Sequence, residues 1–265
     1  MFKIDKKAKD ISMGLMGIGL IALIVGFIAD PHRAWPALLF NTYFYLGISL
    51  FAVFFIALQY VSEAGWSIAL KRVPEAIMGA LPAFSIIMLF IVFAAIMHWN
   101  HIYHWLAEGI MDPLNVKGNE GAQYPYYDEI IAGKEAYLNA GFFIIRTVIY
   151  LVGWNYFAKK LRDLSVFEEL KGGTAIHSKS VRSSAWFIVF FAVTSSMAAW
   201  DWIMSIDTHW FSTLFGWYVF AEWAVIGFTT IFLFTLYLRQ RGYLPNVNDS
   251  HIHDLGKFIF AFSLV

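Results

Sequence analysis

Long, continuous apolar runs dominate this chain, and short polar segments separate them. Six runs carry few or no charges: 11–29, 38–60, 75–97, 139–157, 184–206 and 212–238. Their lengths are close to the roughly 20 residues that a helix needs to cross the hydrocarbon layer of a membrane. Open sheet would leave its edge amides unpaired in lipid, and the runs do not alternate, so we expect six transmembrane helices.

A seventh apolar run, 255–265, reaches the end of the sequence after eleven residues, too few to span a membrane. We therefore expect an all-α, polytopic transmembrane helix bundle with six full spans and the start of a seventh. Residues 1–265 would form a single integral membrane domain, as part of a longer protein. Span 11–29 is followed by Asp30 and Pro31 rather than by a small-residue cleavage site, so we interpret it as a membrane anchor and not as a signal peptide.

The basic residues of the connecting segments lie mainly on one side of the predicted membrane. Fifteen Lys and Arg residues fall on the side of the N-terminus and the 158–183 loop, and three fall on the other side. Cytoplasmic segments are enriched in Lys and Arg. We therefore expect a cytoplasmic N-terminus, a cytoplasmic 158–183 loop and an external, periplasmic 98–138 loop.

Composition narrows the chemistry that the chain can carry. It is 59% hydrophobic and 14% charged, whereas soluble domains are about 25% charged. Lys and Arg together equal Asp and Glu, so net charge gives no indication of nucleic-acid binding. The absence of Cys excludes disulfides, thiolate metal sites and iron–sulfur ligation within this chain. We expect the chain to hold no metal and no cofactor of its own.

Three charged residues fall inside the predicted spans. At 1.5 Å of rise per residue, Asp201 lies roughly 8 Å deep, Arg146 roughly 10 Å and Glu222 roughly 15 Å. Charges at such depth cost several kcal/mol unless they are paired or hydrated. One arginine cannot neutralise two carboxylates, so we predict that Arg146 pairs with Asp201 at matching depth. Thr194, Asp201 and Ser205 follow helical spacing, and we expect their face to point into the bundle.

These charges allow a structural and a functional interpretation. The Arg146–Asp201 pair could simply tie two helices together, and Glu222 could be a neutral acid hydrogen-bonded to a neighbouring helix. Alternatively, Glu222 could relay protons, because burial without a cation favours the protonated carboxyl. Glu222, Asp201 and Arg146 are therefore the candidate proton path, with Glu222 as the first choice.

The segment HWNHIYHW places His98, His101 and His104 three residues apart at the outer end of the third span. If the helix continues, these side chains fall near one helix face. They could anchor the helix at the membrane interface beside Trp99 and Trp105, line a polar ligand pocket, or bind a metal. The other His residues lie in loops or at span ends, which argues against a haem held between two facing helices.

Four segments carry a resemblance to a known family. They are WDWIMSIDTHWFSTLFGWYVFAEW (200–223), RSSAWFIVFFAVTSSMAA (182–199), FNTYFYLGISLFAVFFIALQYVSEAGWS (40–67) and KRVPEAIMGALP (71–82). Together they resemble the second NrfD-type membrane subunit of alternative complex III, a bacterial quinol:electron-acceptor oxidoreductase. The resemblance covers the whole chain, and it implies about ten spans, of which this sequence would supply six and the start of a seventh.

The resemblance implies a subunit of the bacterial inner membrane that takes part in menaquinol oxidation. The electrons would be carried by partner subunits with iron–sulfur clusters and multiple c-type haems, beside a paralogous NrfD-type subunit with the better-established quinol pocket. Four residues of this sequence lie in the family's motifs: Asp201, Asp207, His209 and Glu222. With His98 and His101 added from the same predicted end, the candidate quinone-binding residues are Asp201, Asp207, His209, His98 and His101.

Two other functions fit the same pattern. A secondary transporter or ion channel would also place charges near the membrane midplane, although it usually has Gly- or Pro-broken helices at its site. A scaffold subunit without a site of its own would explain the 11 Trp and 26 Phe residues as lipid and subunit contacts. Isolation in mild detergent distinguishes these functions, because only a respiratory subunit would carry haem and iron–sulfur partners with it.

Overall fold

The computed structural model describes residues 6–114 and 127–264, and within these ranges it contains helices and no strand. The longer helices are α1 (Lys6–Ala29), α2 (Pro31–Val61), α4 (Leu81–Ile96), α6 (Ala140–Lys171), α7 (Thr174–Trp202), α8 (Phe215–Gln240) and α9 (Asp249–Ser263). Two short helices, α3 (Arg72–Ile77) and α5 (Glu129–Ala132), and several 3-10 turns connect them. Within the described residues, six helical segments are long and apolar enough to cross a membrane, with α3 and α4 forming one of them. The prediction of a polytopic all-α bundle is confirmed.

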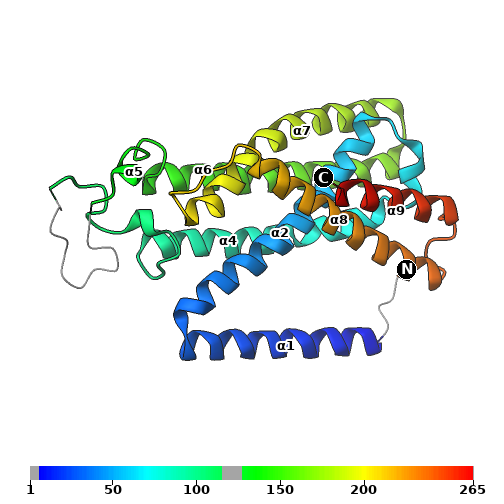
Figure 1. The fold of residues 1–265 in the computed structure, drawn as a ribbon. Helices are drawn as coiled ribbons and strands as arrows, with labels where there is room; N and C mark the ends of the chain where they lie inside the picture. Colours follow the sequence, from blue (N-terminus) through cyan, green and yellow to red (C-terminus); the bar gives the residue numbers. More distant parts are fainter. Residues whose placement is uncertain (1–5, 115–126, 265) are drawn as a thin grey trace.

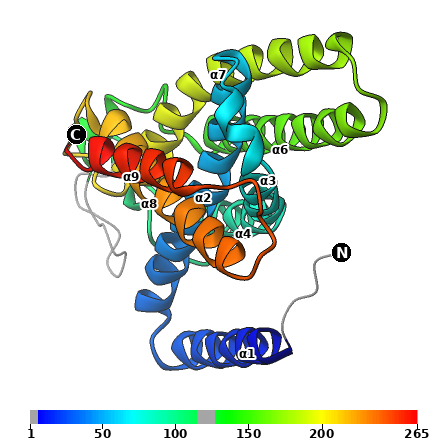
Figure 2. The ribbon, with the colours of Figure 1, turned by 90° about the vertical axis from the view of Figure 1, so that its right-hand side faces the viewer.

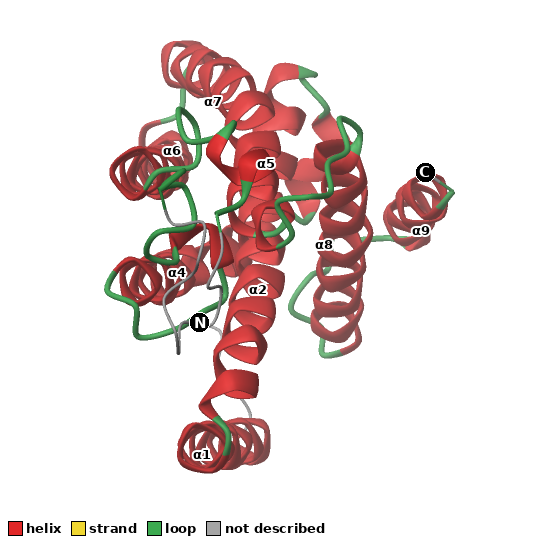
Figure 3. Cartoon of the chain, turned by 60° about the vertical axis from the view of Figure 1, so that its left-hand side comes forward, coloured by secondary structure: helices red, strands yellow, loops and turns green. Residues whose placement is uncertain are grey.

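Helix α2 is the centre of the bundle. It packs against α4, α7 and α8, while α6 packs against α7 and α4 (Figure 3). Two glycines let α2 and α8 approach closely, because a Cβ on Gly47 would lie 2.2 Å from the Trp223 indole nitrogen and one on Gly227 would lie 2.1 Å from Phe51. Only a residue without a side chain fits at such a contact.

Helix α1 stands apart from the other helices and packs mainly on the first turns of α2 (Figures 1 and 2). The chain turns sharply between them, where Asp30 caps α2 and Pro31 occupies its first position. Proline suits this position because the first helical N–H has no partner within the helix. None of the residues of α1 is buried, and from Ile11 onward apolar side chains cover it on all sides. Such a helix suits a lipid environment.

The spans run antiparallel between two ends, which are named here by their residues. The basic end holds the connections 62–71, 172–173 and 241–248, with Lys71, Arg72 and Arg239 (right in Figure 1). The His end holds the connections 97–139 and 203–214, with His104 and His209 (left in Figure 1). Residues 115–126 of the predicted 98–138 loop, including Lys117, lie outside the described residues.

The predicted 158–183 loop is wrong, because most of it is helical. Helix α6 continues to Lys171 and α7 begins at Thr174, so only Gly172 and Gly173 connect them. Both glycines have positive φ, of 65° and 98°, which other residues rarely adopt. At 32 residues, α6 is about 48 Å long and extends well beyond a hydrocarbon layer of about 30 Å. The apolar run therefore marks the part of the helix in lipid and not the helix end.

Candidate functional site

A buried ion pair joins α6 to α7 near the His end. The Arg146 Nε and Nη2 atoms donate to the two carboxylate oxygens of Asp201, each at 2.8 Å. The two side chains are 3% and 0% exposed. A two-pronged guanidinium–carboxylate contact of this kind is among the stronger and more directional hydrogen-bonded pairs in proteins. The predicted pairing of Arg146 with Asp201 is confirmed.

Aromatic residues complete the shell around this pair. The Tyr150 hydroxyl donates to Asp201 at 2.9 Å, and Arg146 Nη1 donates to the backbone oxygen of Tyr137 at 3.0 Å. The guanidinium also lies 3.9 Å from the centre of the Tyr137 ring and 4.2 Å from that of Phe142. Three side-chain hydrogen bonds therefore enclose the Asp201 carboxylate and close it to direct contact with a ligand.

A pocket of about 470 Å³ lies at the His end, against the Tyr137 side of this pair. It is lined by Gly133, Lys134, Ala136, Tyr137, Leu138, Trp200, Met204, Ser205, Thr208, Trp210 and Phe211. The Trp200 indole nitrogen is buried and has no hydrogen-bond partner among the described residues. The Tyr137 hydroxyl is also buried and lies near Asp201; burial, together with the charge of Asp201 and a hydrogen bond to it, raises the pKa of the Tyr137 phenol well above its ordinary value. Both donors therefore lie buried behind the aromatic wall of the pocket, and the Trp200 N–H is unused.

Two imidazoles and a carboxylate extend from this pocket towards the surface of the His end. His104 Nε2 lies 2.8 Å from the hydroxyl of Thr208, which lines the pocket. The ring of His209 stacks on that of His104 with centroids 6.0 Å apart, and its Nε2 lies 2.7 Å from Asp128. Thr208, His104, His209 and Asp128 thus form a polar row that begins at the buried Thr208 and ends at the half-buried Asp128, with ring stacking between the two imidazoles.

The Asp128 carboxyl also caps α5. It accepts from the backbone N–H groups of Ile130 at 3.0 Å and Ile131 at 3.1 Å. Partial burial alone would raise the pKa of this carboxyl, but the Ile131 N–H and the contact with His209 outweigh it and leave the pKa below its ordinary value. Asp128 is therefore ionised at neutral pH and positions His209.

The structure does not gather the predicted quinone-binding residues into one group. Asp201 is enclosed by Arg146, and the Asp207 side chain accepts from the backbone N–H of His209 at 3.1 Å. Helix α4 ends at Ile96 and His98 has a φ of 58°, so the helix does not continue through the histidines and they do not share one helix face. The chain turns away from the helix at Trp99 and Asn100. The Asn100 side-chain amide stabilises this turn because it donates to the backbone oxygen of Ile91.

The three histidines accordingly face different neighbours. His98 and His101 are exposed, His101 stacks on His32 at 6.3 Å, and His104 joins the row with His209. Within residues 6–114 and 127–264, no three His, Asp or Glu side chains are arranged to hold a metal ion.

Glu222 lies on an open face of α8. Its side chain is exposed, and among the described residues it has no hydrogen bond or ion pair, in contrast to Asp201. Trp217 and Tyr218, one turn before it, are 67% and 65% exposed. The chain therefore does not bury Glu222 in its own core, and the expected burial of this carboxyl within the chain is wrong. In a membrane, an ionised carboxylate that faces lipid is costly, so Glu222 must either be protonated or be covered by another protein surface.

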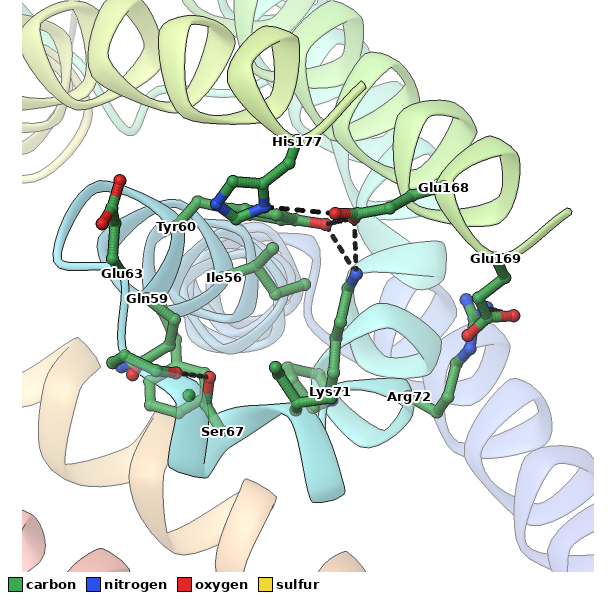
Figure 4. A pocket seen from close by; sticks show the side chains of 15 residues that line it. Ile56, Gln59, Tyr60, Glu63, Ser67, Lys71, Arg72, Glu168, Glu169 and His177 are labelled. Atoms are coloured by element: carbon green, nitrogen blue, oxygen red, sulfur yellow. Dashed lines mark hydrogen bonds and ion pairs between the residues drawn. The ribbon is translucent and has the colours of Figure 1, made fainter. Parts of the chain in front are cut away.

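A second polar cluster, which the sequence did not reveal, lies at the basic end. The Lys71 ammonium donates to the Tyr60 hydroxyl at 2.6 Å, and that hydroxyl donates to Glu168 at 2.9 Å (Figure 4). His177 Nδ1 lies 3.1 Å from the other oxygen of Glu168. Beside it, Arg72 pairs with Glu169 and with the buried Glu75, which also accepts from Ser165. The sequence analysis used Lys71 and Arg72 for the orientation of the chain and within the segment KRVPEAIMGALP, and did not predict that they belong to a site.

The geometry thus offers two sites, one at each end of the bundle. No protein-family model matches this chain. No curated protein matches it either.

Proposed function

We propose that this chain is a membrane subunit of a quinol:electron-acceptor oxidoreductase of the alternative complex III type. It would lie in the bacterial inner membrane with its N-terminus in the cytoplasm and its His end on the periplasmic side. The observation that carries the proposal is the His-end pocket, which combines aromatic walls with two buried donors, Tyr137 and Trp200, beside the buried Arg146–Asp201 pair.

This pocket suits the head group of a quinone. Cofactor and ligand pockets are mostly apolar, with a few polar groups that fix the orientation of the ligand. The quinone oxygens would accept from the Trp200 N–H and the Tyr137 hydroxyl once small side-chain movements turn these buried donors towards the pocket, while Met204 and Phe211 would contact the ring and tail. Asp201 would act indirectly: it would hold Arg146 against the Tyr137 ring and so position Tyr137, without contacting the quinone itself.

Quinol oxidation releases protons, and the polar row at the His end offers them a route. A proton acceptor works best when its pKa lies near the working pH, as that of histidine does. The row runs from Thr208 through His104 and His209 to Asp128, which is ionised and lies at the surface of that end. The electrons would pass to haem c and iron–sulfur clusters on partner subunits.

Glu222 is the second proposed proton carrier, on the face of α8 that the chain leaves open. A partner subunit, such as the paralogous NrfD-type subunit, would cover this face and give the carboxyl its surroundings. Infrared difference spectra of the wild type and Glu222→Gln would test this role. A change of the protonated-carboxyl band during turnover that disappears in Glu222→Gln supports it, and identical spectra refute it.

Isolation of the protein from its membrane in mild detergent tests the function as a whole. We expect co-purification with subunits that contain c-type haem and iron–sulfur clusters, seen in visible and electron paramagnetic resonance spectra. Within that complex, Tyr137→Phe removes one donor and keeps the ring, so the KM for quinol should rise about tenfold. A chain that purifies alone and transports a solute in liposomes would overturn the proposal.

A further inference from the structure

The basic-end pocket and the His-end pocket differ in charge. The basic-end pocket, a cavity of about 310 Å³, contains both signs, and its Lys, Arg and Glu residues are Glu63, Lys71, Arg72, Glu168 and Glu169 (Figure 4). Among the described residues that line the His-end pocket, Lys134 is the one charged side chain, and no carboxylate accompanies it. The His-end pocket therefore combines aromatic and aliphatic walls with a single positive charge.

Lys134 is held in the pocket wall by contacts on both sides. Its ammonium donates to the backbone oxygen of Thr208, which is also a lining residue. Its own backbone oxygen accepts from the N–H groups of Tyr137 at 2.9 Å and Leu138 at 2.8 Å, so a tight turn brings Lys134 and Tyr137 into the same wall. An ammonium has three N–H donors, and the bond to Thr208 uses one of them.

The charge of Lys134 is not neutralised from within the described chain. Across residues 6–114 and 127–264, no carboxylate lies within ion-pair distance of its ammonium. Arg146, behind Tyr137, is neutralised by Asp201, and Glu135 is exposed and lines a different cavity. The remaining titratable groups of this end are Asp128, Asp207, His104 and His209. A half-buried cation without a counter-charge favours a ligand that supplies a negative oxygen.

The polar row beside the pocket has a nitrogen that can take a proton. His104 Nδ1 lies 3.0 Å from the backbone oxygen of Ile206, which can only accept, so Nδ1 carries the hydrogen. In the neutral ring, Nε2 then carries the lone pair and accepts from the Thr208 hydroxyl at 2.8 Å. A ligand proton that reaches Thr208 can therefore move on to His104.

We propose that the His-end pocket binds its ligand as a phenolate-type anion, with Lys134 as the catalytic residue that holds the negative oxygen. The preference for an anion rests on the pocket alone, whereas the choice of a quinol as the ligand rests on the proposed function. One quinol O–H bond breaks before the electrons leave, and its electron pair stays on the oxygen beside the Lys134 ammonium. The proton passes to the Thr208 hydroxyl as that hydroxyl gives its own proton to His104 Nε2.

A coloured phenol measures this preference directly. The probe, 4-nitrophenol, ionises near neutral pH and absorbs visible light strongly only as the anion. It is added to the detergent-solubilised protein with its co-purified partners and read in difference spectra against the protein alone. A hydrogen bond from a charged donor should favour the anion about tenfold, so the bound probe should ionise about one pH unit lower than in empty micelles. An apolar pocket without a counter-charge would raise this midpoint instead.

The variant Lys134→Gln removes the charge and keeps a donor for the Thr208 oxygen. The midpoint of the bound probe should return to the value in empty micelles or exceed it, and the affinity for the anion should fall about tenfold. The affinity for 4-nitroanisole, the neutral methyl ether, should stay as in the wild type. Lys134→Arg should keep the lowered midpoint. Lys179→Gln, which removes the same charge from an exposed position at the basic end, is the matched control and should behave as the wild type does.

Three outcomes would overturn the anion site. The first is a wild-type midpoint at or above that in empty micelles, which needs no variant to be seen. The second is an equal loss of affinity for both probes in Lys134→Gln, because the lysine would then only shape the pocket. The third is displacement of the probe by phosphatidylglycerol but not by a menaquinol analogue, which would assign the pocket to a lipid phosphate.

These outcomes are separate from failure of the proposed function. A chain that purifies without haem and iron–sulfur partners refutes quinol oxidation, and the probe titration still decides whether the pocket holds an anion. In the intact complex, Lys134→Gln should lower kcat for quinol oxidation about tenfold, and Lys134→Arg should restore most of it. An unchanged kcat in Lys134→Gln would refute the catalytic role of the lysine.

Discussion

The strongest prediction concerns the buried pair of Arg146 and Asp201. Replacing Asp201 by Asn keeps the shape of the side chain and removes its charge. The guanidinium then loses the anion that neutralised it and keeps one firm acceptor, the backbone oxygen of Tyr137. Breaking a buried pair by removing one partner costs about 3–5 kcal/mol, because it strands a charge away from water. We therefore expect Asp201→Asn to lower the free energy of unfolding by about 3 kcal/mol or more.

The matching change from the other side is Arg146→Met, which strands the carboxylate with Tyr150 as its remaining side-chain donor. It should cost a similar amount. The double variant has neither charge, so its loss of stability should fall short of the sum of the two single losses by about 2–3 kcal/mol. Tyr150→Phe, which removes a single hydrogen bond to the carboxylate, is the control and should cost about 1.5 kcal/mol.

The assay is reversible unfolding of the detergent-solubilised protein by increasing amounts of sodium dodecyl sulfate, followed by tryptophan fluorescence. Trp154 and Trp202 lie buried at the interface of α6 and α7 and hydrogen-bond across it, so they report on that interface. If the two single losses simply add in the double variant, the residues do not act as a pair and the electrostatic reasoning is refuted.

Two further predictions concern packing and pH. Gly47→Ala should lower the free energy of unfolding by about 1–3 kcal/mol, because its Cβ would overlap the buried ring of Trp223, whereas Gly17→Ala, with open space around it on α1, should change it little in the same assay. Because the pKa of Asp128 is lowered in the folded chain, its contribution to stability is fully present above its unfolded pKa of about 3.9 and is lost as the pH falls through the folded value. The protection factors of the α5 amides against hydrogen exchange, taken relative to the intrinsic rate at each pH, should therefore fall in acid for the wild type; they should already be low at neutral pH in Asp128→Ala, and protection that is unchanged in Asp128→Ala would contradict the role of the carboxylate. His209→Ala should lose only part of that protection, since the backbone N–H groups remain bonded to Asp128.

Several features of the chain follow from its sequence without any tertiary information. The spans follow from apolar length, because a hydrocarbon layer sets a minimum that local composition either meets or does not. The pairing of Arg146 with Asp201 follows from depth arithmetic, because helical rise is constant and an unpaired charge at that depth is too costly. These inferences rest on properties of single helices.

Other features depend on how the helices meet, and the sequence could not supply them. Helix α6 extends beyond the end of its apolar run, and α7 begins before the start of its own. A helix can continue into water with polar side chains, so the end of an apolar run does not fix the end of the helix. The chain leaves helix α4 at His98, and the Asn100 side chain donates back to the backbone oxygen of Ile91 in that helix. A hydrogen bond from one side chain cannot be predicted from the periodicity of apolar residues. Whether Glu222 faced the core or the outside depended on the rotation of α8, which close packing at Gly47 and Gly227 sets.

The two pockets show the same division most clearly. At the basic end, Tyr60 lies beside Glu168 and His177, which are both more than a hundred residues later in the sequence. At the His end, Tyr137 lines the same pocket as Trp200 and Thr208. Taken singly in the sequence, each of these residues is an ordinary side chain at a membrane interface. The sequence by itself determined which segments lie in the membrane and which charges need partners, since those depend on transfer free energies of local stretches. Only the tertiary structure decided which distant side chains share a cavity, because that depends on the rotation and crossing of whole helices.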